Sequence, residues 1–478
     1  MIISQAARAI FISLMLASSA GAASTAADVP ITLAECIATA VRDNRTIKNA
    51  YLDRVAQKYD LRVAEDKFTP KLLLTPSLLG NGGKGTTATA VTTDLAGTIT
   101  ELLPTGAAIS LNANYDFTRT VNTPPGRTSS WGVSLIQPFL KGGGVDVNMA
   151  SVRTARLTDQ DNILTLKSTL ISTLTTVVTA YRGYVQAVKA LEISKQSLGR
   201  SKALVDINRE LISAGRMAAI EIVQSEADVA GKEFSLLSAE NDVEAARLAL
   251  TKAIDIDKNS RITPVEEKGI PPVPYTLAEG TKLALENRPD YQSLLLGYEN
   301  AKIQLLVSKN NTLWDLSLTG GYVGNRARGG ATGGAGLTNS WYTGLLLTVP
   351  IGDLSIRQGY ITAEVALKKA ENTLASQRES VEIEVENALR SADMNLRQIK
   401  LATLSRVLSE KKVDIETEKL KAGRSTNFQL VSFQNDLVNA QNSELGAIIT
   451  YLNALTTLDQ TLGITLDRLG VSLVERKE

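Results

Sequence analysis

Histidine is absent from the 478-residue sequence, and cysteine occurs only once, at Cys36. The chain therefore has no histidine general base, no serine–histidine triad and no histidine-ligated metal site. One cysteine permits no internal disulfide. The sequence also contains no phosphate-binding glycine loop, no clustered cysteines and no isolated pair of carboxylates in apolar surroundings. We therefore expect no enzymatic activity, no cofactor and no metal site.

Neither charge sign is in excess, because 51 lysines and arginines are mixed with 50 aspartates and glutamates. A nucleic-acid-binding surface usually leaves a basic patch, so no nucleic-acid partner is expected. Beyond the N-terminus, no stretch approaches the roughly 18 uninterrupted apolar residues of a membrane-spanning helix. The sequence predicts that helices do not hold this chain in a membrane.

The N-terminus has the pattern of a secretory signal peptide. Arg8 precedes an apolar run from Ala9 to Leu16, and small residues follow, with AGA at positions 20–22. Such a run is too short to span a bilayer permanently. We predict a signal peptide over residues 1–22, with cleavage near residues 22–27, and therefore an exported protein.

Cys36 lies in the short sequence LAEC, which could suggest a lipid anchor. Glu35 directly before the cysteine, and the distance from the apolar run, argue against that interpretation. Free cysteines usually pack as small hydrophobic residues. We expect Cys36 to be a buried free thiol.

The sequence repeats itself in two halves. VDINRELISAGR at residues 205–216 returns as VDIETEKLKAGR at residues 413–424, and TLAE occurs at residues 32–35 and 276–279. Thr-x-x-Glu is a capping box that starts a helix. A stretch rich in proline and charge separates the halves. We therefore assign a first repeat to residues 28–258, a linker to 259–275 and a second repeat to 276–470.

Each half contains a segment in which apolar and polar residues alternate, about residues 72–138 and 314–349. Ile109, Leu111, Ala113, Tyr115 and Phe117 alternate with polar residues, which indicates strands with one apolar face. The intervening loops are polar and glycine-rich, and Trp131, Trp314 and Trp341 all lie in or beside such strands. A transmembrane β-barrel has this signature, with aromatic residues at the membrane interfaces. An edge hairpin on a soluble sheet is the alternative.

Long helical tracts follow the strands, at about residues 151–254 and 355–462. Leu174, Val177, Tyr181, Tyr184 and Val188 are three and four positions apart in turn, which is the heptad spacing of long packed helices. Gly215 and Gly423 interrupt the tracts. A glycine just past a helix end can take the left-handed conformation that terminates it. We expect two equivalent helical hairpins with their tips at these glycines.

Four motifs, in the same order in both halves, resemble the TolC-type outer-membrane efflux proteins. They are TLAE, SLIQPFLKGGG at residues 134–144 with its counterpart LLLTVPIGD at 345–353, the AGR tip, and IEIVQSEADVA at 220–230 with FQLVSFQNDLV at 428–438. Each motif alone is weak, but their repeated order covers nearly the whole mature chain.

The resemblance implies a mixed fold of long helices and a transmembrane β-barrel in the cell outer membrane. It implies a homotrimer whose copies share one barrel in outer-membrane lipid and one α-helical tunnel in the periplasm. Such a protein is a passive exit duct of a tripartite efflux or type I secretion system, served by a periplasmic adaptor and an inner-membrane pump. A periplasmic coiled-coil adaptor or a trimeric surface stalk is the alternative, although neither accounts for strands in both halves.

The candidate site residues lie at the tips and at the strand–helix junctions. Family members often carry a carboxylate six residues after the tip glycine, near the tunnel entrance, where three copies would form a cation-selective ring. Glu221 has this place in the first half, but Gln429 has it in the second, with Ser432 three residues on. The tips themselves are Gly215, Arg216, Gly423 and Arg424. A helical glutamate with no role is the alternative for Glu221.

Pro138 and Pro350 stand where a strand leaves the sheet and a helix follows. Proline cannot donate to a strand ladder, and its fixed φ suits a first helical turn. Gly142 and Gly352 are expected to supply the bend.

The strand count of the first half departs from the family pattern of two strands per half. An extra pair is expected at about residues 95–103 and 107–117, joined by a tight turn in LPTGA. Either the pair enlarges the barrel, giving six strands per copy and eighteen in a trimer, or it projects as a hairpin from a barrel of twelve. Glu101 among the apolar positions favours the projecting hairpin, which is our prediction.

Overall fold

The computed structural model describes residues 29–82, 90–266, 269–329 and 335–472, so the expected signal peptide lies outside the described residues. The chain divides into two compact units. The first comprises Met1–Asp53, Leu164–Gln292 and Gln377–Glu478, and the second comprises Arg54–Ile163 and Ser293–Ser376. Each unit takes residues from both sequence repeats, so the compact units do not follow the repeat boundary.

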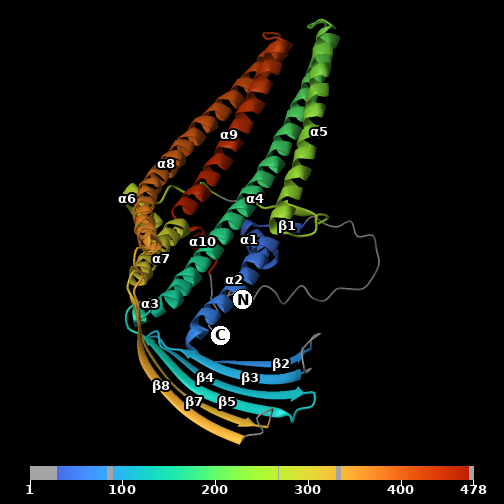
Figure 1. Ribbon diagram of the computed structural model, residues 1–478. Coiled ribbons are helices and arrows are strands. Elements are labelled where there is room, and N and C mark those ends of the chain that lie inside the picture. Colours follow the sequence, from blue (N-terminus) through green and yellow to red (C-terminus); the bar gives the residue numbers. More distant parts are fainter. Residues whose placement is uncertain (1–28, 83–89, 267–268, 330–334, 473–478) are drawn as a thin grey trace. The chain divides into compact units, whose positions relative to one another are not determined.

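The helices are long, as the heptad spacing predicts (Figure 1). α4 and α8 extend over 64 and 68 residues. The helices are α1 (Leu33–Asp43), α2 (Arg45–Glu65), α3 (Val145–Asn148), α4 (Ala150–Ser213), α5 (Glu221–Ile254), α6 (Leu277–Asn287), α7 (Pro289–Asn311), α8 (Leu354–Lys421), α9 (Asn427–Thr461) and α10 (Thr465–Arg468), with a 3-10 turn η2 at Asp66–Phe68. The strands are β1 (Val29–Ile31), β2 (Lys71–Asn81), β3 (Ala90–Leu102), β4 (Ala108–Thr120), β5 (Gly126–Pro138), β6 (Ile262–Pro264), β7 (Asp315–Arg328) and β8 (Ala335–Thr348).

Both predicted capping boxes are present and start α1 and α6. The Thr32 hydroxyl accepts a hydrogen bond from the Glu35 amide at 3.3 Å, and the Glu35 carboxylate accepts one from the Thr32 amide at 2.8 Å. Thr276 and Glu279 repeat this exchange at 3.4 and 3.1 Å. Satisfying the free amides in this way stabilises each helix start.

The first unit has a hydrophobic core in which the heptad residues of α4 are buried. Leu170, Leu174, Val177 and Tyr181 pack with apolar residues of α1, α2 and α5. Cys36 belongs to the same cluster and is fully buried and free, as predicted. Burial, followed by the nearby charge of Glu35, raises the pKa of the Cys36 thiol to about 12, so the thiol stays protonated and behaves as a packing group.

By length and composition alone, α4 contains an 18-residue window apolar enough to cross a membrane, with a mean hydropathy of 1.4. The sequence analysis did not expect this window. Because α4 buries Leu170, Leu174 and Val177 inside the first unit, its apolar character also fits a core helix.

The expected linker contains a strand that the sequence analysis missed. β6 pairs in parallel with β1, with Val29 beside Ile262 and Ile31 beside Pro264. The hydroxyls of Tyr181 and Tyr184 donate to backbone carbonyls of this two-stranded sheet, including Ile31 at 3.1 Å and Ile262 at 2.6 Å. The linker is therefore fastened to the start of the first repeat.

The second unit contains an antiparallel sheet in the order β2-β3-β4-β5-β7-β8. Its register places residues of like polarity side by side. Ile99, Leu111, Val133, Tyr322 and Trp341 form one continuous row across five strands. The sheet thus has one apolar and one polar face, as the alternation predicts.

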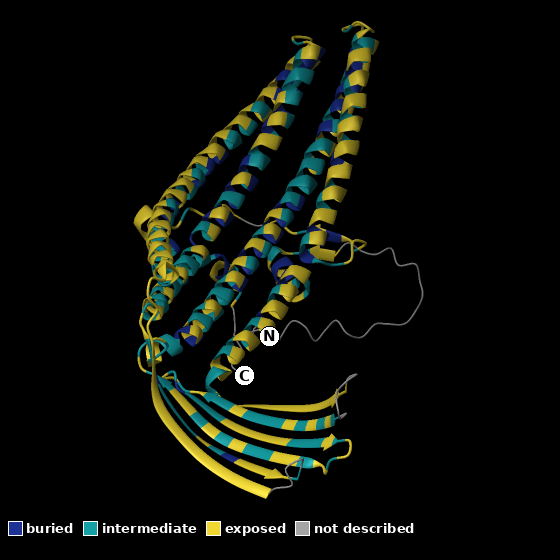
Figure 2. Cartoon of the chain, in the orientation of Figure 1, coloured by how far each residue is buried: buried dark blue, intermediate teal, exposed yellow. Residues whose placement is uncertain are grey.

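The described residues leave the apolar face of the sheet uncovered. The hydrophobic clusters found among the described residues all lie in the first unit. In contrast, β2 and β8 are exposed along their whole length (Figure 2), and Trp341 is 75% exposed. A sheet that leaves this much apolar surface in contact with water requires another apolar environment to cover it.

The predicted projecting hairpin is wrong. β3 and β4 lie inside the sheet, where β3 pairs with β2 and β4 pairs with β5. Their connection is the expected tight turn, in which the Gly106 amide donates to the Leu103 carbonyl at 2.9 Å. The turn packs on the strand–helix junction, because the Gly144 amide donates to the Thr105 carbonyl at 3.0 Å. Glu101 lies one residue from the end of β3, beside this turn.

Candidate functional site

The two helix tips, at the ends of α4 and α8, have the same backbone geometry. Gly215 and Gly423 have φ angles of 70° and 71°. The Gly215 amide donates to the Ile212 carbonyl and the Arg216 amide to the Leu211 carbonyl, at 2.9 and 2.8 Å. At the other tip, Gly423 and Arg424 donate to Leu420 and Lys419 at the same two distances. Both helices therefore end in a Schellman motif, as the repeated AGR sequence predicts.

The helices that leave the two tips start differently. α5 begins at Glu221 with no side-chain cap, whereas Thr426 caps α9 and accepts from the Gln429 amide at 3.2 Å. Glu221 is thus the first residue of its helix and Gln429 the third. Equal sequence distance from the glycine does not give equal positions in the helix. Glu221, Gln429 and Ser432 are all half-buried.

A buried amide network that the sequence analysis missed joins the two tips. Asn208 and Asn427 are almost fully buried, and the Asn208 amide nitrogen donates to the Asn427 side-chain oxygen at 3.0 Å. Asn427 in turn donates to the Glu221 carbonyl at 3.3 Å and to the Gln224 side chain at 3.4 Å. α4, α5 and α9 are held together at this point, beside an apolar cluster that contains Leu204, Leu420 and Leu430.

The second tip has a carboxylate at the position that corresponds to Asn208. Glu416 is nearly buried and accepts from the Ser425 hydroxyl at 2.5 Å and from the Lys419 ammonium at 3.1 Å. The bond from Ser425, then that from Lys419, lowers the pKa of Glu416 below its ordinary value. Glu416 thereby holds the loop after Gly423 against α8.

The tips present both charge and apolar surface to solvent. Arg216 and Arg424 are exposed. Beside them, Ile220 and Phe428 are 72% and 68% exposed. Large apolar side chains at this exposure are typical of a protein contact rather than of a free surface.

The strand–helix junctions match the expected bends but not the expected role of proline. Gly142 and Gly352 have positive φ angles of 77° and 75°. Pro138, however, ends β5, and Pro350 precedes α8 by four residues, so neither lies in a first helical turn. The first junction is fixed by Asn148, whose side chain donates to the carbonyls of Gly142 and Gly144 at 2.8 and 2.9 Å.

The three tryptophans belong to the sheet. Trp131 and Trp341 lie within β5 and β8 on the apolar face, and Trp314 directly precedes β7. The Trp131 ring packs on Tyr322 with the ring centroids 5.2 Å apart. All three indole rings are at least half exposed.

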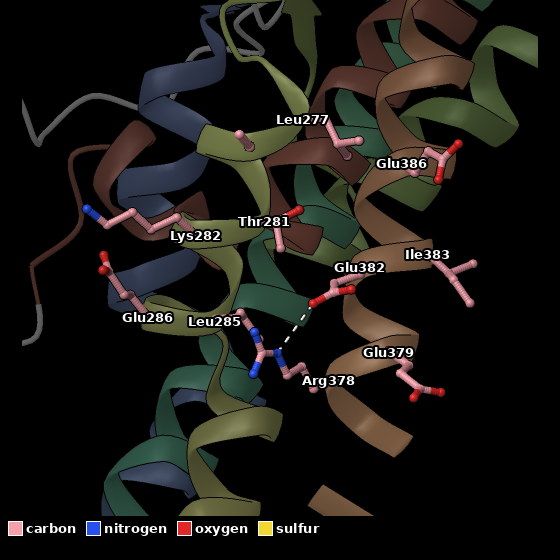
Figure 3. Close-up of a pocket in the computed structure, with 11 residues that line it drawn as sticks. Leu277, Thr281, Lys282, Leu285, Glu286, Arg378, Glu379, Glu382, Ile383 and Glu386 are labelled. Carbon is pink, nitrogen blue, oxygen red and sulfur yellow. Dashed lines mark hydrogen bonds and ion pairs between the residues drawn. The ribbon is translucent and has the colours of Figure 1, made fainter. Parts of the chain in front are cut away.

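A groove of about 870 Å³ lies between α6 and α8 in the first unit (Figure 3). Glu382 accepts from Arg378 at 3.3 Å, while Glu379 and Glu386 point away from this pair. The carboxylates that line the groove therefore do not converge on one point. Within the described residues, no group of three or more histidine, cysteine, aspartate or glutamate side chains is placed to hold a metal ion.

A comparison with models of protein families finds one match. Residues 281–464 match the model of the family described as "Outer membrane efflux protein". The search of curated proteins finds no match.

Solved outer-membrane channels share the fold over most of their length. The CmeC channel of Campylobacter jejuni is 17% identical, with 91% of this chain and 86% of that chain covered and a TM-score of 0.65. VceC of Vibrio cholerae is 14% identical, with coverages of 90% and 96% and a TM-score of 0.68. The open MtrE channel of Neisseria gonorrhoeae is 17% identical, with coverages of 91% and 89% and a TM-score of 0.63.

The family model matches most of the second repeat, and the chain shares the fold of solved outer-membrane channels, which agrees with the resemblance to TolC-type outer-membrane efflux proteins. The predictions of an outer-membrane channel and of an outer-membrane location agree with both matches. The family is one of channels rather than of enzymes.

Substituting valine for Gly215 or Gly423 is expected to disturb the tips without blocking export. Valine resists positive φ, which costs about 1–2 kcal/mol per site. Adaptor binding should weaken while the amount of protein in the outer membrane stays near that of the wild type. Gly199→Val, in the helical part of α4 with open space around the glycine, is the matched control and should bind normally. Equal binding by all variants would show that the tips are not the contact surface.

The Glu416 contacts predict a pH dependence of the second tip. Because the pKa of Glu416 is lower in the folded state, its contribution to stability is complete above its ordinary value of 4.5. This contribution is lost as the pH falls through the lower, folded-state pKa. Ser425→Ala should reduce this acid sensitivity, as measured by hydrogen exchange of residues 413–427 between pH 3 and 7. An unchanged pH profile would contradict the assigned role of Ser425.

Proposed function

We propose that the protein is a homotrimeric, passive exit duct of a tripartite efflux or type I secretion system. Three copies share one barrel in the outer membrane and one helical tunnel in the periplasm, and an adaptor and an inner-membrane pump supply cargo and energy. The observation that carries the proposal is the two-faced sheet, whose apolar face is left uncovered by the chain. Lipid can cover that face, while the polar face lines a water-filled passage.

Strand length supports the membrane assignment. β2, the shortest strand of this sheet, has 11 residues, and β7 and β8 have 14. A tilted strand needs about 9–11 residues to cross the hydrocarbon layer. We assign Trp131, Trp314 and Trp341, which are exposed on or beside the apolar face, to contacts with the membrane and its interfaces.

Two exposed apolar stripes in the first unit support assembly from several copies. Val223, Phe234 and Leu237 form a stripe on α5 with heptad-related spacing. A second stripe lies on α8 and comprises Met394, Leu401, Leu404, Leu408 and Ile415. Single helices with an exposed heptad stripe bury it against a partner helix.

The two stripes lie at similar distances from the tips. Phe234 is the fourteenth residue of α5, and Leu408 is the fourteenth residue from the end of α8. The contacts between Asn208 and Asn427 place the two tips side by side. α5 of one copy can therefore lie antiparallel to α8 of the next with the two apolar stripes in contact.

We assign adaptor docking to the tips, where Ile220 and Phe428 are exposed beside Arg216 and Arg424. A periplasmic adaptor or a surface stalk would use the long helices equally well. Neither would need a sheet with an uncovered apolar face and a polar opposite face, so the duct is favoured.

A disulfide between α5 and α8 of different copies tests the assembly. In a Cys36→Ser background, Phe234→Cys combined with Leu408→Cys should give dimer and trimer bands without reductant, because both residues are fourteen positions from the helix end at the tip. Phe234→Cys combined with Ile383→Cys is the control: both side chains are exposed, but Ile383 lies much further from the tip. A Phe234–Leu408 pair that yields only monomers would argue against this interface.

Glu221 at the start of α5 is proposed to bias conduction toward cations, because three copies would place three carboxylates around the tunnel entrance. In planar bilayers, Glu221→Gln should lower the cation-to-anion permeability ratio. Glu240→Gln, which removes an exposed carboxylate further along the same helix, should leave the ratio unchanged. An unaltered ratio in Glu221→Gln would exclude this role.

A further inference from the structure

The β3–β4 hairpin is an integral part of the sheet. Every residue of β2 pairs with β3, and every residue of β3 pairs with β4. β4 then pairs with β5 from Ala108 to Thr118. A hairpin that projected from the sheet would instead leave β2 to pair with β5.

Both faces of the hairpin continue the faces of the neighbouring strands. Leu95 and Tyr115 lie opposite each other between Pro76 of β2 and Ser129 of β5, on the apolar face. On the polar face, Ser77, Asp94, Asp116 and Thr128 form one row. A one-residue shift would reverse these faces, so the register gives both hairpin strands one apolar and one polar face.

The two hairpin strands are also long enough to cross the membrane. Each has 13 residues, against the roughly 9–11 that a tilted strand requires. Their short turn lies at the end of the sheet where β5 continues toward α3 and α4. The Gly106 position is closely packed there, since a Cβ would collide with the Gly142 carbonyl oxygen. Glu101 lies beside this turn, at the end of its strand, where a charge is least costly.

The free edges of the sheet suit closure through further copies. Neighbouring strands alternate in direction, so β2 and β8, at the two edges of a sheet with six strands in its described part, run in opposite directions. β8 of one copy can therefore pair antiparallel with β2 of the next. Closure of this kind removes all unpaired edges, which lipid cannot satisfy.

We propose that the membrane part of the trimer is a barrel of eighteen strands, in which β3 and β4 of each copy are additional strands of the barrel wall. This inference rests on the proposed function, because it uses the trimer. Barrel diameter grows about linearly with strand number, so eighteen strands give a diameter about 1.5 times that of twelve and a cross-section about twofold larger. Barrels of 16–18 strands leave an open aqueous channel. The outer end of this duct would admit correspondingly bulkier cargo.

Paired cysteines in the outer membrane test the strand order directly. In a Cys36→Ser background, Ser77→Cys is combined either with Asp94→Cys on β3 or with Thr128→Cys on β5. The three positions share one row on the polar face. The first pair should form an intrachain disulfide, detected by mass spectrometry of peptides, and the second should not. Disulfide formation by the β2–β5 pair in the assembled trimer would overturn the eighteen-stranded barrel.

Polymer exclusion tests the width of the proposed barrel. Polyethylene glycols of increasing size are added on the outer side of a planar bilayer that contains the protein, and the largest polymer that still lowers conductance is recorded. Deletion of residues 90–120 leaves β2 and β5 antiparallel, and this variant should exclude polymers that enter the wild type. An equal size limit for a trimeric deletion variant would contradict the inference. If the wild-type protein itself formed no trimer in the outer membrane, the proposed function would be refuted instead.

Discussion

The structure depends on one constraint: no protein covers the apolar face of a long antiparallel sheet in the part of the chain that the structure describes. In the described part of the second unit, the buried apolar residues are only Ala107, Ala150 and Val152. Apolar surface removed from water contributes roughly 25 cal/mol per Å², and this sheet gains almost none of that from its own chain. Its stability must come from another apolar environment, and the proposed barrel supplies lipid on one face and partners for both edges.

The first unit is stabilised in a different way, and this difference assigns the two units their tasks. Its hydrophobic clusters, capping boxes and amide network fix the helices within a single copy. The exposed apolar residues of this unit include the narrow stripes on α5 and α8, of a width that suits a helix from another copy. Helical hairpins that are fixed within one copy and carry an exposed apolar stripe suit the wall of the proposed tunnel.

Local signals allowed much of this to be predicted from the sequence. Thr-x-x-Glu located the starts of α1 and α6, and the glycines of the AGR motifs located two helix ends, because caps and positive φ depend on a few adjacent residues. Alternation identified the strands and their faces for the same reason. The placement of β3 and β4 was predicted wrongly, because the family pattern of two strands per half and a single charge, Glu101, outweighed the alternation that β3 and β4 share with the other strands. Pairing of β1 with β6 and the contact between Asn208 and Asn427 join distant segments and leave no periodic signal in the sequence.

The most direct test of the account is the state of the protein after extraction from the outer membrane. Native mass spectrometry of the detergent-solubilised complex should give three copies of the processed chain, and removal of detergent should cause aggregation as the apolar faces meet water. A monomer that stays in solution without detergent would contradict the account, because its sheet would then need no lipid and its helix stripes no neighbouring copy.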